Sequence, residues 1–308
     1  MGSFMMAVLA LALDRVFGEP EALWNRVPHP ATLMGRVINT LDETLNRGEM
    51  RRIKGFVALA ILVLLAAIIG YIIYWIPDFG ILEMLIAAVL LAHKSLVDHV
   101  REVAQALREG LPQARNAVSL IVGRDTGSMD DSAVSRAAIE SAAENFSDGV
   151  VAPIFWFLIL GLPGILIYKV VNTADSMIGY ENEEYAEFGY ASAKLDDLLN
   201  WIPARISAAL ICLAHFDRGA MDVVFEDADM HRSPNAGWPE AAMAGVLGVA
   251  LSGPRSYGGF MTQDEYVNPN GKMSLGADDI DRSVAALNRS WAALVAVLAL
   301  PMLITLIF

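Results

Sequence analysis

The sequence contains a single cysteine, Cys212, among 308 residues. One cysteine excludes an internal disulfide and cannot alone supply the thiolates of a structural zinc site. Charged residues are also scarce, at 19% of the chain against about 25% in soluble domains. The 22 Lys and Arg are outnumbered by 35 Asp and Glu, which gives a formal charge of −13. Such a chain lacks the basic face that nucleic acid requires, so no nucleic-acid partner is expected.

Two familiar nucleotide-binding motifs are missing as well. No segment has the form GxxxxGK[ST], because Gly271-Lys272 is followed by Met273 and lacks the upstream glycine. No GxGxxG fingerprint follows a strand-like segment either. A nucleotide would therefore have to bind here through a less common type of nucleotide-binding site.

Apolar residues, in contrast, are abundant. They make up 55% of the chain, and the mean hydropathy is +0.45, above what is usual for a soluble globular domain. This excludes a disordered chain. The composition predicts a membrane protein with a substantial polar portion.

The clearest membrane span is Gly55–Ile76, which contains no charged residue and exceeds the about 20 residues that a helix needs to cross a bilayer. Basic residues stand just before it and Asp78 follows it. Since cytoplasmic loops carry an excess of Lys and Arg, the N-terminal end of this span is expected in the cytoplasm. Ser290–Phe308 is the second strong span, with a kink expected at Pro301.

The remaining apolar runs are weaker. Met1–Leu13 lacks the basic start of a signal peptide, and is expected to be an uncleaved helix. Ile81–Ala92 is expected to return toward the cytoplasm. Gly149–Val171 is expected to break at 161–164 and to form a helical hairpin or a re-entrant segment instead of one straight helix. Residues 201–214 and 237–251 are expected to be short core helices. The prediction is an all-α, polytopic integral membrane protein of about four to six membrane-embedded helices, without strand ladders and as a single domain over residues 1–308.

A helix predicted over Ser132–Asn145 leads into a row of acids. Glu140, Glu144 and Asp148 follow one another at steps of four, on one face. Three acids on one face repel one another unless a cation or a basic partner lies between them. Asp148 stands at the membrane edge, where an unpaired acid is costly. Oxygen ligands at this spacing suit Mg²⁺, and a solvated acidic face is the alternative.

The densest polar stretch interleaves acids, amides and bases at a membrane surface. Carboxylates can hold a cation while Lys and Arg neutralise phosphate, and a structural salt-bridge network is the alternative. Its members are Asn172, Asp175, Ser176, Lys194, Asp196, Asp197, Asn200 and Arg205.

Two further stretches have the composition of ordered loops. Gly and Pro residues between Leu13 and Arg36 predict a fixed connector, which carries Arg15 and His29. Ser233 and Asn235 precede a helix expected near Pro239, where they could offer donors to an anion. An ordinary connector and an ordinary helix start are the alternatives.

Long ordered motifs recur in these stretches: Arg136–Pro153, Val171–Tyr180, Phe188–Arg205, Ser233–Gly245, and the opening Leu13-Asp14-Arg15 with Gly18-Glu19-Pro20 and His29-Pro30. Together they resemble the CobD/CbiB family of cobalamin biosynthesis, adenosylcobinamide-phosphate synthase. The resemblance implies an ATP- and Mg²⁺-dependent ligase of vitamin B12 assembly. Such an enzyme joins adenosylcobyric acid to aminopropanol or aminopropanol phosphate, in the cell membrane, with its active site facing the cytoplasm. The lipid bilayer and other nucleotide-loop assembly enzymes are the further expected partners.

The chemistry of this reaction suggests roles for the polar residues. ATP must convert the carboxylate to an acyl phosphate or acyl adenylate, which requires a metal, cations and a base. The expected catalytic residues are Glu140, Glu144, Asp148, Asp175 and Lys194, and Glu140, Glu144 and Asp175 are the expected metal ligands. The expected substrate-binding residues are Arg15, His29, Arg36, Asn145, Asn172, Ser176, Asp196, Asp197, Asn200, Arg205, Ser233 and Asn235. All are expected to converge at the inner leaflet.

Two other classes of function fit a helical membrane protein. A transporter or channel would use intramembrane acids such as Glu83, Asp148 and Glu240 to line a pathway, but it predicts paired broken helices and similar halves. Only one break is evident in the sequence. A scaffold that recruits soluble enzymes would not need so many clustered acids and bases.

Overall fold

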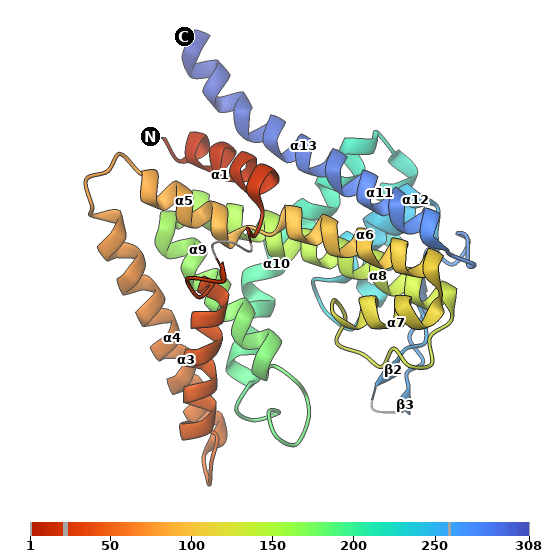
Figure 1. Cartoon of the computed structure of the whole chain (residues 1–308), viewed down its shortest axis with the longest axis horizontal. Helices are drawn as coiled ribbons and strands as arrows, with labels where there is room; N and C mark the ends of the chain where they lie inside the picture. Colours follow the sequence, from red (N-terminus) through yellow and green to blue (C-terminus); the bar gives the residue numbers. More distant parts are fainter. Residues whose placement is uncertain (1, 21–23, 258–259, 308) are drawn as a thin grey trace. The chain divides into compact units, whose positions relative to one another are not determined.

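A computed structural model describes residues 2–20, 24–257 and 260–307. Helices dominate these residues, and the β structure among them is limited to pairs of two-residue strands (Figure 1). Four helical segments in the described part are long and apolar enough to cross a membrane: Arg51–Tyr74, Asp131–Ile178, Tyr190–His215 and Ala277–Pro301. The predicted all-α, polytopic membrane fold is confirmed.

The chain divides into two compact units. Unit 1 comprises residues 1–92, 148–200 and 298–308, and unit 2 comprises residues 93–147 and 201–297. The chain therefore leaves one unit for the other after residues 92, 147, 200 and 297. That all 308 residues form one domain stays a prediction.

Unit 1 is organised around helix α9 (Ala152–Ile178). This helix contacts α1 (Ser3–Phe17), α3 (Pro30–Leu45), α4 (Arg51–Tyr74) and α5 (Ile81–Leu90). Helices α3 and α4 run side by side in Figure 1 and contact each other. The first turns of α10 (Tyr190–His215) complete the unit.

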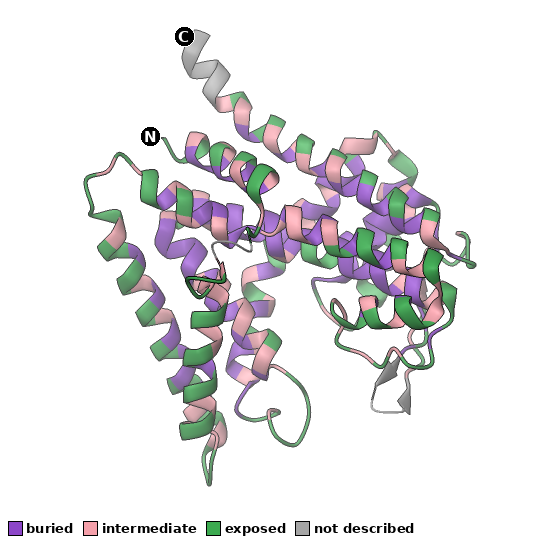
Figure 2. Ribbon diagram, viewed as in Figure 1, coloured by how far each residue is buried: buried purple, intermediate pink, exposed green. Residues whose placement is uncertain are grey.

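Helix α4 confirms the predicted span Gly55–Ile76. Its large aliphatic side chains are mostly exposed (Figure 2), as expected for a surface that lipid covers. Its buried positions are mostly small, and Gly70 faces Pro163 of α9 so closely that a Cβ atom would lie 2.6 Å from the Pro163 Cα. Small residues let membrane helices approach closely, which explains a glycine at this position.

Helix α9 is broken where the sequence predicts. Gly161 has φ 65° and ψ −150°, which is not helical, and Pro163 follows it. Glycine tolerates a positive φ at little cost, and proline cannot supply the next backbone donor. The two parts of α9 on either side of Gly161 are therefore separate helical halves.

Unit 2 is organised around helix α8 (Asp131–Phe146), which is buried along most of its length (Figure 2). It contacts α6 (His93–Glu109), α7 (Leu111–Ser119), α12 (Gly237–Leu247) and strand β1. The other elements are the C-terminal part of α10, α11 (Arg218–Asp227), the short 3₁₀ helix Ala228–Met230, β1 (Leu251–Ser252), β2 (Ser256–Tyr257), β3 (Phe260–Met261), β4 (Tyr266–Val267) and most of α13 (Ala277–Ile307).

Three expectations differ from the structure. The segment 251–267 contains two antiparallel strand pairs, β1–β4 and β2–β3, where no strands were expected. Residues 201–214 are not a short helix, because they continue α10 from Tyr190. After α8 the chain widens into a π-helix, Ser147–Val151. A π-turn changes the helical period, so the step of four that places Glu140 and Glu144 on one face does not extend to Asp148.

Candidate functional site

The acidic cluster of unit 1 joins the end of α9 to the start of α10. Both carboxylate oxygens of Asp196 accept hydrogen bonds, one from the Asn172 amide at 3.2 Å and one from the Asn200 amide at 2.9 Å. The Tyr168 hydroxyl lies 2.9 Å from the Asn200 Oδ1 and 3.1 Å from the Asp148 carbonyl. Tyr168 and Asn200 are almost fully buried. The end of α9 and the start of α10 are therefore held together by amide and hydroxyl side chains.

Asp175 lies one turn beyond Asn172 on α9, and its charge interacts with those of Asp196 and Asp197. Gly179 makes room for it, since a Cβ atom at that position would lie 2.1 Å from the Asp175 Oδ1. Lys194 pairs with Asp197 at 3.0 Å and also attracts the charge of Asp175. Ser176 donates to the Asn172 carbonyl. The predicted site residues between 172 and 200 are thus brought into one cluster.

The predicted site residues near the N-terminus lie in unit 1 as well. His29 caps α3, where its Nδ1 accepts the Ala31 N–H at 3.2 Å, and its ring meets the edge of Trp24. Arg15 lies in the last turn of α1, and Arg36 lies on α3. In the described part of the chain, no hydrogen bond or ion pair links these three side chains to the acidic cluster. Their role in substrate binding stays a prediction.

Unit 2 holds a different group of charges, which is buried. Glu140 of α8 accepts the Ser252 N–H at 2.6 Å through Oε1, and its Oε2 pairs with Arg124 and with Arg255. Arg255 also lies 3.5 Å from Glu240 of α12. Both oxygens of Glu140 are therefore engaged within the protein. Glu144, one turn later on α8, is exposed, and so is Asn145, whose amide donates to the Ser141 carbonyl.

His231 extends this buried group. Its Nδ1 accepts the Ser233 N–H at 3.0 Å, and its Nε2 lies 3.2 Å from the Arg255 Nη1 and 3.6 Å from the Glu240 carboxylate. Burial and the charge of Arg255 lower the pKa of His231 to about 4. Burial, and the charge of Glu140 after it, raise the pKa of Glu240. At neutral pH the His231–Glu240 contact is thus a contact of a neutral imidazole, not an ion pair.

Arg205 of α10 and the loop ahead of α12 meet in unit 2. The guanidinium lies over the rings of Trp201 and Trp238, and its Nη1 is 3.4 Å from the Asn235 Oδ1. Ser233 Oγ accepts the N–H groups of Asn235 and Ala236. Two of the backbone donors of this loop are therefore bound by Ser233 within the loop itself, while Arg205, Ser233 and Asn235 do gather in one place.

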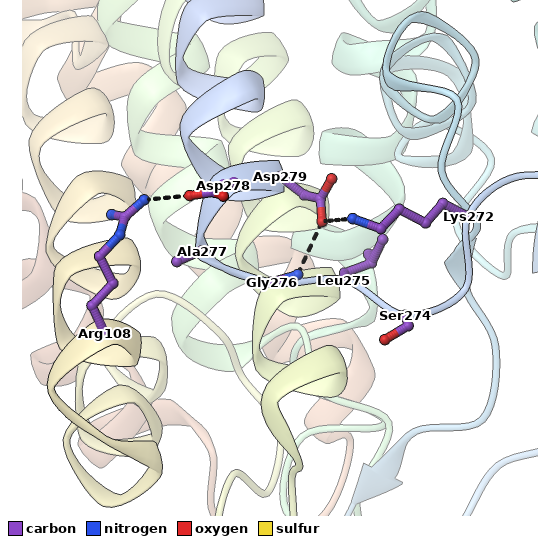
Figure 3. A pocket seen from close by; sticks show the side chains of 8 residues that line it. All are labelled: Arg108, Lys272, Ser274, Leu275, Gly276, Ala277, Asp278 and Asp279. Carbon is purple, nitrogen blue, oxygen red and sulfur yellow. Dashed lines mark hydrogen bonds and ion pairs between the residues drawn. The ribbon is translucent and has the colours of Figure 1, made fainter.

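A surface pocket of unit 2 is lined by other residues. Figure 3 shows it at the start of α13, where Arg108 pairs with Asp278 and Lys272 with Asp279. Asp279 also accepts the Gly276 N–H and pairs with Arg282. The charged side chains that line this pocket pair with one another and cap the start of α13, and none of the predicted site residues lines the pocket.

No group of three or more His, Cys, Asp or Glu side chains in the described residues is arranged to hold a metal ion. The predicted Mg²⁺ ligands Glu140 and Glu144 belong to unit 2, and Asp175 belongs to unit 1. The assignment of a metal to these three residues, and the convergence of all site residues at one leaflet, stay predictions.

Sequence reasoning missed several residues that the structure places in these clusters. Tyr168 lies in an apolar run, where only its hydroxyl distinguishes it from a packing residue. His231 and Arg255 lie outside the motifs, and only their contacts reveal them. Trp201 and Trp238 lie inside the motifs Phe188–Arg205 and Ser233–Gly245, but only their contacts with Arg205 distinguish them there. The nearest sequence signal was the clustering of polar residues after 230.

Comparison with known proteins identifies the family. Residues 7–287 match the CobD/Cbib protein family. The chain belongs to the CobD/Cbib family. The resemblance drawn from the sequence motifs is thereby confirmed.

Several proteins with this family's name align with this chain over nearly their whole length, at close to half sequence identity. Cobalamin biosynthesis protein CobD of Sinorhizobium fredii is 48% identical, and the alignment covers 98% of both chains. The protein of the same name from Rhizobium meliloti is 47% identical, over 97% of this chain and 98% of its own. That of Brucella suis is 49% identical, over 93% and 92%. No solved structure matches the chain.

Proposed function

We propose that this chain acts in cobalamin biosynthesis as an ATP-dependent amide ligase, which joins adenosylcobyric acid to aminopropanol or aminopropanol phosphate. Identity of 47–49% to proteins named cobalamin biosynthesis protein CobD supports the pathway. The observation that carries the reaction type is the acidic cluster of unit 1, in which Asp175, Asp196 and Asp197 lie with Lys194 between two helix ends.

The donor set of this cluster fits a magnesium–nucleotide substrate. Mg²⁺ prefers carboxylate oxygens, and it commonly uses only one or two of them together with substrate phosphates. Asp175 and Asp197 are the residues we propose to hold it, because both oxygens of Asp196 are occupied by amides. A bound Mg²⁺ supplies charge neutralisation on the phosphates.

The chain's own residues have defined tasks in this proposal. In the first step the carboxylate oxygen of the corrin acid bonds to phosphorus, and a P–O bond of ATP breaks. Lys194 binds a phosphate oxygen and stabilises the negative charge that develops in this step. Asp196 is held by the amides of Asn172 and Asn200 and fixes the end of α9 against the start of α10. An acid of the cluster accepts a proton from the ammonium group of the amine substrate. The free amine nitrogen then forms the C–N bond with the activated carboxyl carbon, and phosphate or AMP leaves.

The transporter alternative has less support. It needs acids free to line a pathway, but Glu240 is buried beside Arg255 and His231, and Glu83 receives a backbone hydrogen bond. A ligase accounts for the dense unit 1 cluster without requiring either acid. In this proposal the unit 1 cluster faces the cytoplasm, where ATP is available.

The test is a turnover assay on the full-length protein in detergent or nanodiscs. ATP, Mg²⁺ and adenosylcobyric acid are supplied with either aminopropanol or its phosphate, and the amide and the nucleotide product are measured by mass spectrometry. We expect ATP-dependent amide formation that falls at least about a hundredfold in D175N and in D196N. D222N, at an exposed position of α11, is the matched control. Absence of amide in the native protein, or near-native turnover in both variants, contradicts the proposal.

A further inference from the structure

The Arg205 guanidinium makes cation–π contacts with two indole rings. Its central carbon lies 4.4 Å from the centroid of the Trp201 ring and 4.3 Å from that of Trp238. Cation–π stacking of this kind is stronger when the faces of the cation are shielded from water. The two indole rings lie against this guanidinium, and its N–H edges are the parts that can bind another group.

One of these edges is already used by the protein. Nη1 donates to the Trp201 carbonyl at 2.8 Å, and it lies 3.5 Å from the Pro234 carbonyl and 3.4 Å from the Asn235 Oδ1. These neutral acceptors fix the plane and the rotation of the group. A guanidinium has five N–H donors in a rigid fork, and the described contacts of Arg205 involve Nη1 alone.

The charge of Arg205 is not neutralised by an ion pair. Among the ion pairs formed by described residues, none includes Arg205, and the charge of Asp229 acts on it without an ion pair. The side chain is only partly exposed and stands in a helix long and apolar enough to cross a membrane. An unneutralised cation in such a segment is costly, which points to an anionic ligand that supplies the missing charge.

We propose that Arg205, with Trp201 and Trp238, is a phosphate-binding subsite, in which the Nε and Nη2 edge binds two oxygens of a phosphate group. The paired N–H groups of arginine match this geometry. A phosphate monoester carries a charge of about −1.5 to −2 at neutral pH and so gains more from a desolvated guanidinium than a carboxylate does. The phosphate comes from the amine substrate, from ATP or from a lipid headgroup, and the first two sources rest on the proposed function.

Equilibrium binding to the purified full-length protein tests this subsite without relying on turnover. The probes are aminopropanol phosphate, ATP with Mg²⁺, short-chain phosphatidylglycerol and, as a carboxylate without phosphate, adenosylcobyric acid. The variants are R205K, which keeps the charge but loses the fork, and W238L, which removes one stacking face. R218K, at an exposed arginine of α11, is the matched control.

We expect R205K to weaken the binding of one phosphate probe about tenfold, and W238L to weaken the same probe severalfold. The probe that responds identifies the source of the phosphate, and R218K leaves it unchanged. Thermal unfolding without ligand checks that the variants are folded, and W238F, which restores a ring face, is expected to recover binding.

The proposal is overturned if folded R205K and W238L bind every phosphate probe as the native protein does, or if only adenosylcobyric acid binds more weakly. A protein that shows the Arg205-dependent binding but makes no amide contradicts the proposed function and leaves the subsite standing. Amide formation that is unaffected in R205K, together with unchanged binding, contradicts the subsite alone.

Discussion

The carboxylate of Glu83 accepts a hydrogen bond from the backbone N–H of Leu162, at the break between the two halves of α9. The break frees backbone donors that the preceding turn would otherwise satisfy, and Glu83 of α5 is buried beside it. An acid within an apolar helix therefore has a structural explanation: it caps the second half of α9, the half that carries Asn172 and Asp175.

Replacing Glu83 tests this cap. E83L removes the acceptor and leaves the Leu162 N–H unsatisfied in an apolar setting, which costs about 1–3 kcal/mol. E83Q keeps an oxygen acceptor and is expected to retain most of the stability. Thermal unfolding in detergent measures both, with E43L at an exposed position of α3 as the control. Equal unfolding temperatures for E83L and E43L would argue against the cap.

The close approach of α4 to α9 at Gly70 makes a second prediction. A methyl group at this position would collide with Pro163, so G70A is expected to destabilise the protein by about 1–3 kcal/mol. Gly35 of α3 is the matched control, because a Cβ atom there would make an ordinary contact with Met177 at 3.5 Å. G35A is expected to be neutral or to stabilise by up to about 1 kcal/mol through helix propensity. Unfolding temperatures in the reverse order would refute the packing argument.

The two acids of α8 are expected to respond differently to substitution. E140A leaves Arg124 and Arg255 as buried charges without their shared partner, and the loss of one member of a buried pair costs about 3–5 kcal/mol. E144A changes an exposed side chain and is expected to alter stability by less than about 0.5 kcal/mol. Folded yield and thermal unfolding measure the contrast. If E140A folds as stably as E144A, the buried group does not stabilise unit 2.

The buried imidazole of His231 predicts a loss of stability in acid. Its pKa is about 4 in the folded protein instead of 6.5, so the folded state resists protonation more than the unfolded state does. The stability present above pH 6.5 is therefore lost as the pH falls from 6.5 through 4, by about 3 kcal/mol at full protonation.

The variant H231Q isolates this effect, because an amide oxygen can accept the Ser233 N–H and the amide does not titrate. Its unfolding temperature is expected to fall less than that of the native protein between pH 7 and pH 4. The raised pKa of Glu240 acts in the opposite direction, since its contribution is present at low pH and lost as the pH rises. H99Q, at an exposed histidine of α6, is the control. Parallel pH profiles for H231Q and the native protein would contradict the prediction.

The sequence was informative where one segment determines its own structure. The uncharged run from Gly55 predicted α4, the Gly-Pro cluster predicted the break at Gly161, and Ser132–Asn145 predicted α8 almost to its ends. Polar motifs also predicted that residues 172–176 and 194–200 share a site, because membrane-embedded polar residues are seldom placed without partners.

Other features depend on contacts that no local pattern encodes. Tyr168 looks like one more apolar residue until Asn200 is placed against it. Glu140 looks like a candidate ligand until Arg255, over a hundred residues later in the chain, is found beside it. The strand pairs of 251–267 are too short for alternation to reveal them, and the π-turn at Ser147 breaks a spacing argument that assumed a constant period.

The repeated passage of the chain between the two units has a consequence for biogenesis. A ribosome that has synthesised residues 1–147 has completed neither unit, because unit 1 still lacks α9 and unit 2 still lacks α11 to α13. Nascent chains therefore expose the face of α8 that α12 covers until residues 237–247 have been synthesised, and such surfaces attract chaperones and proteases. No N-terminal fragment of the gene encodes an intact half of this protein, so a premature stop codon anywhere before the last helix leaves both units unfinished.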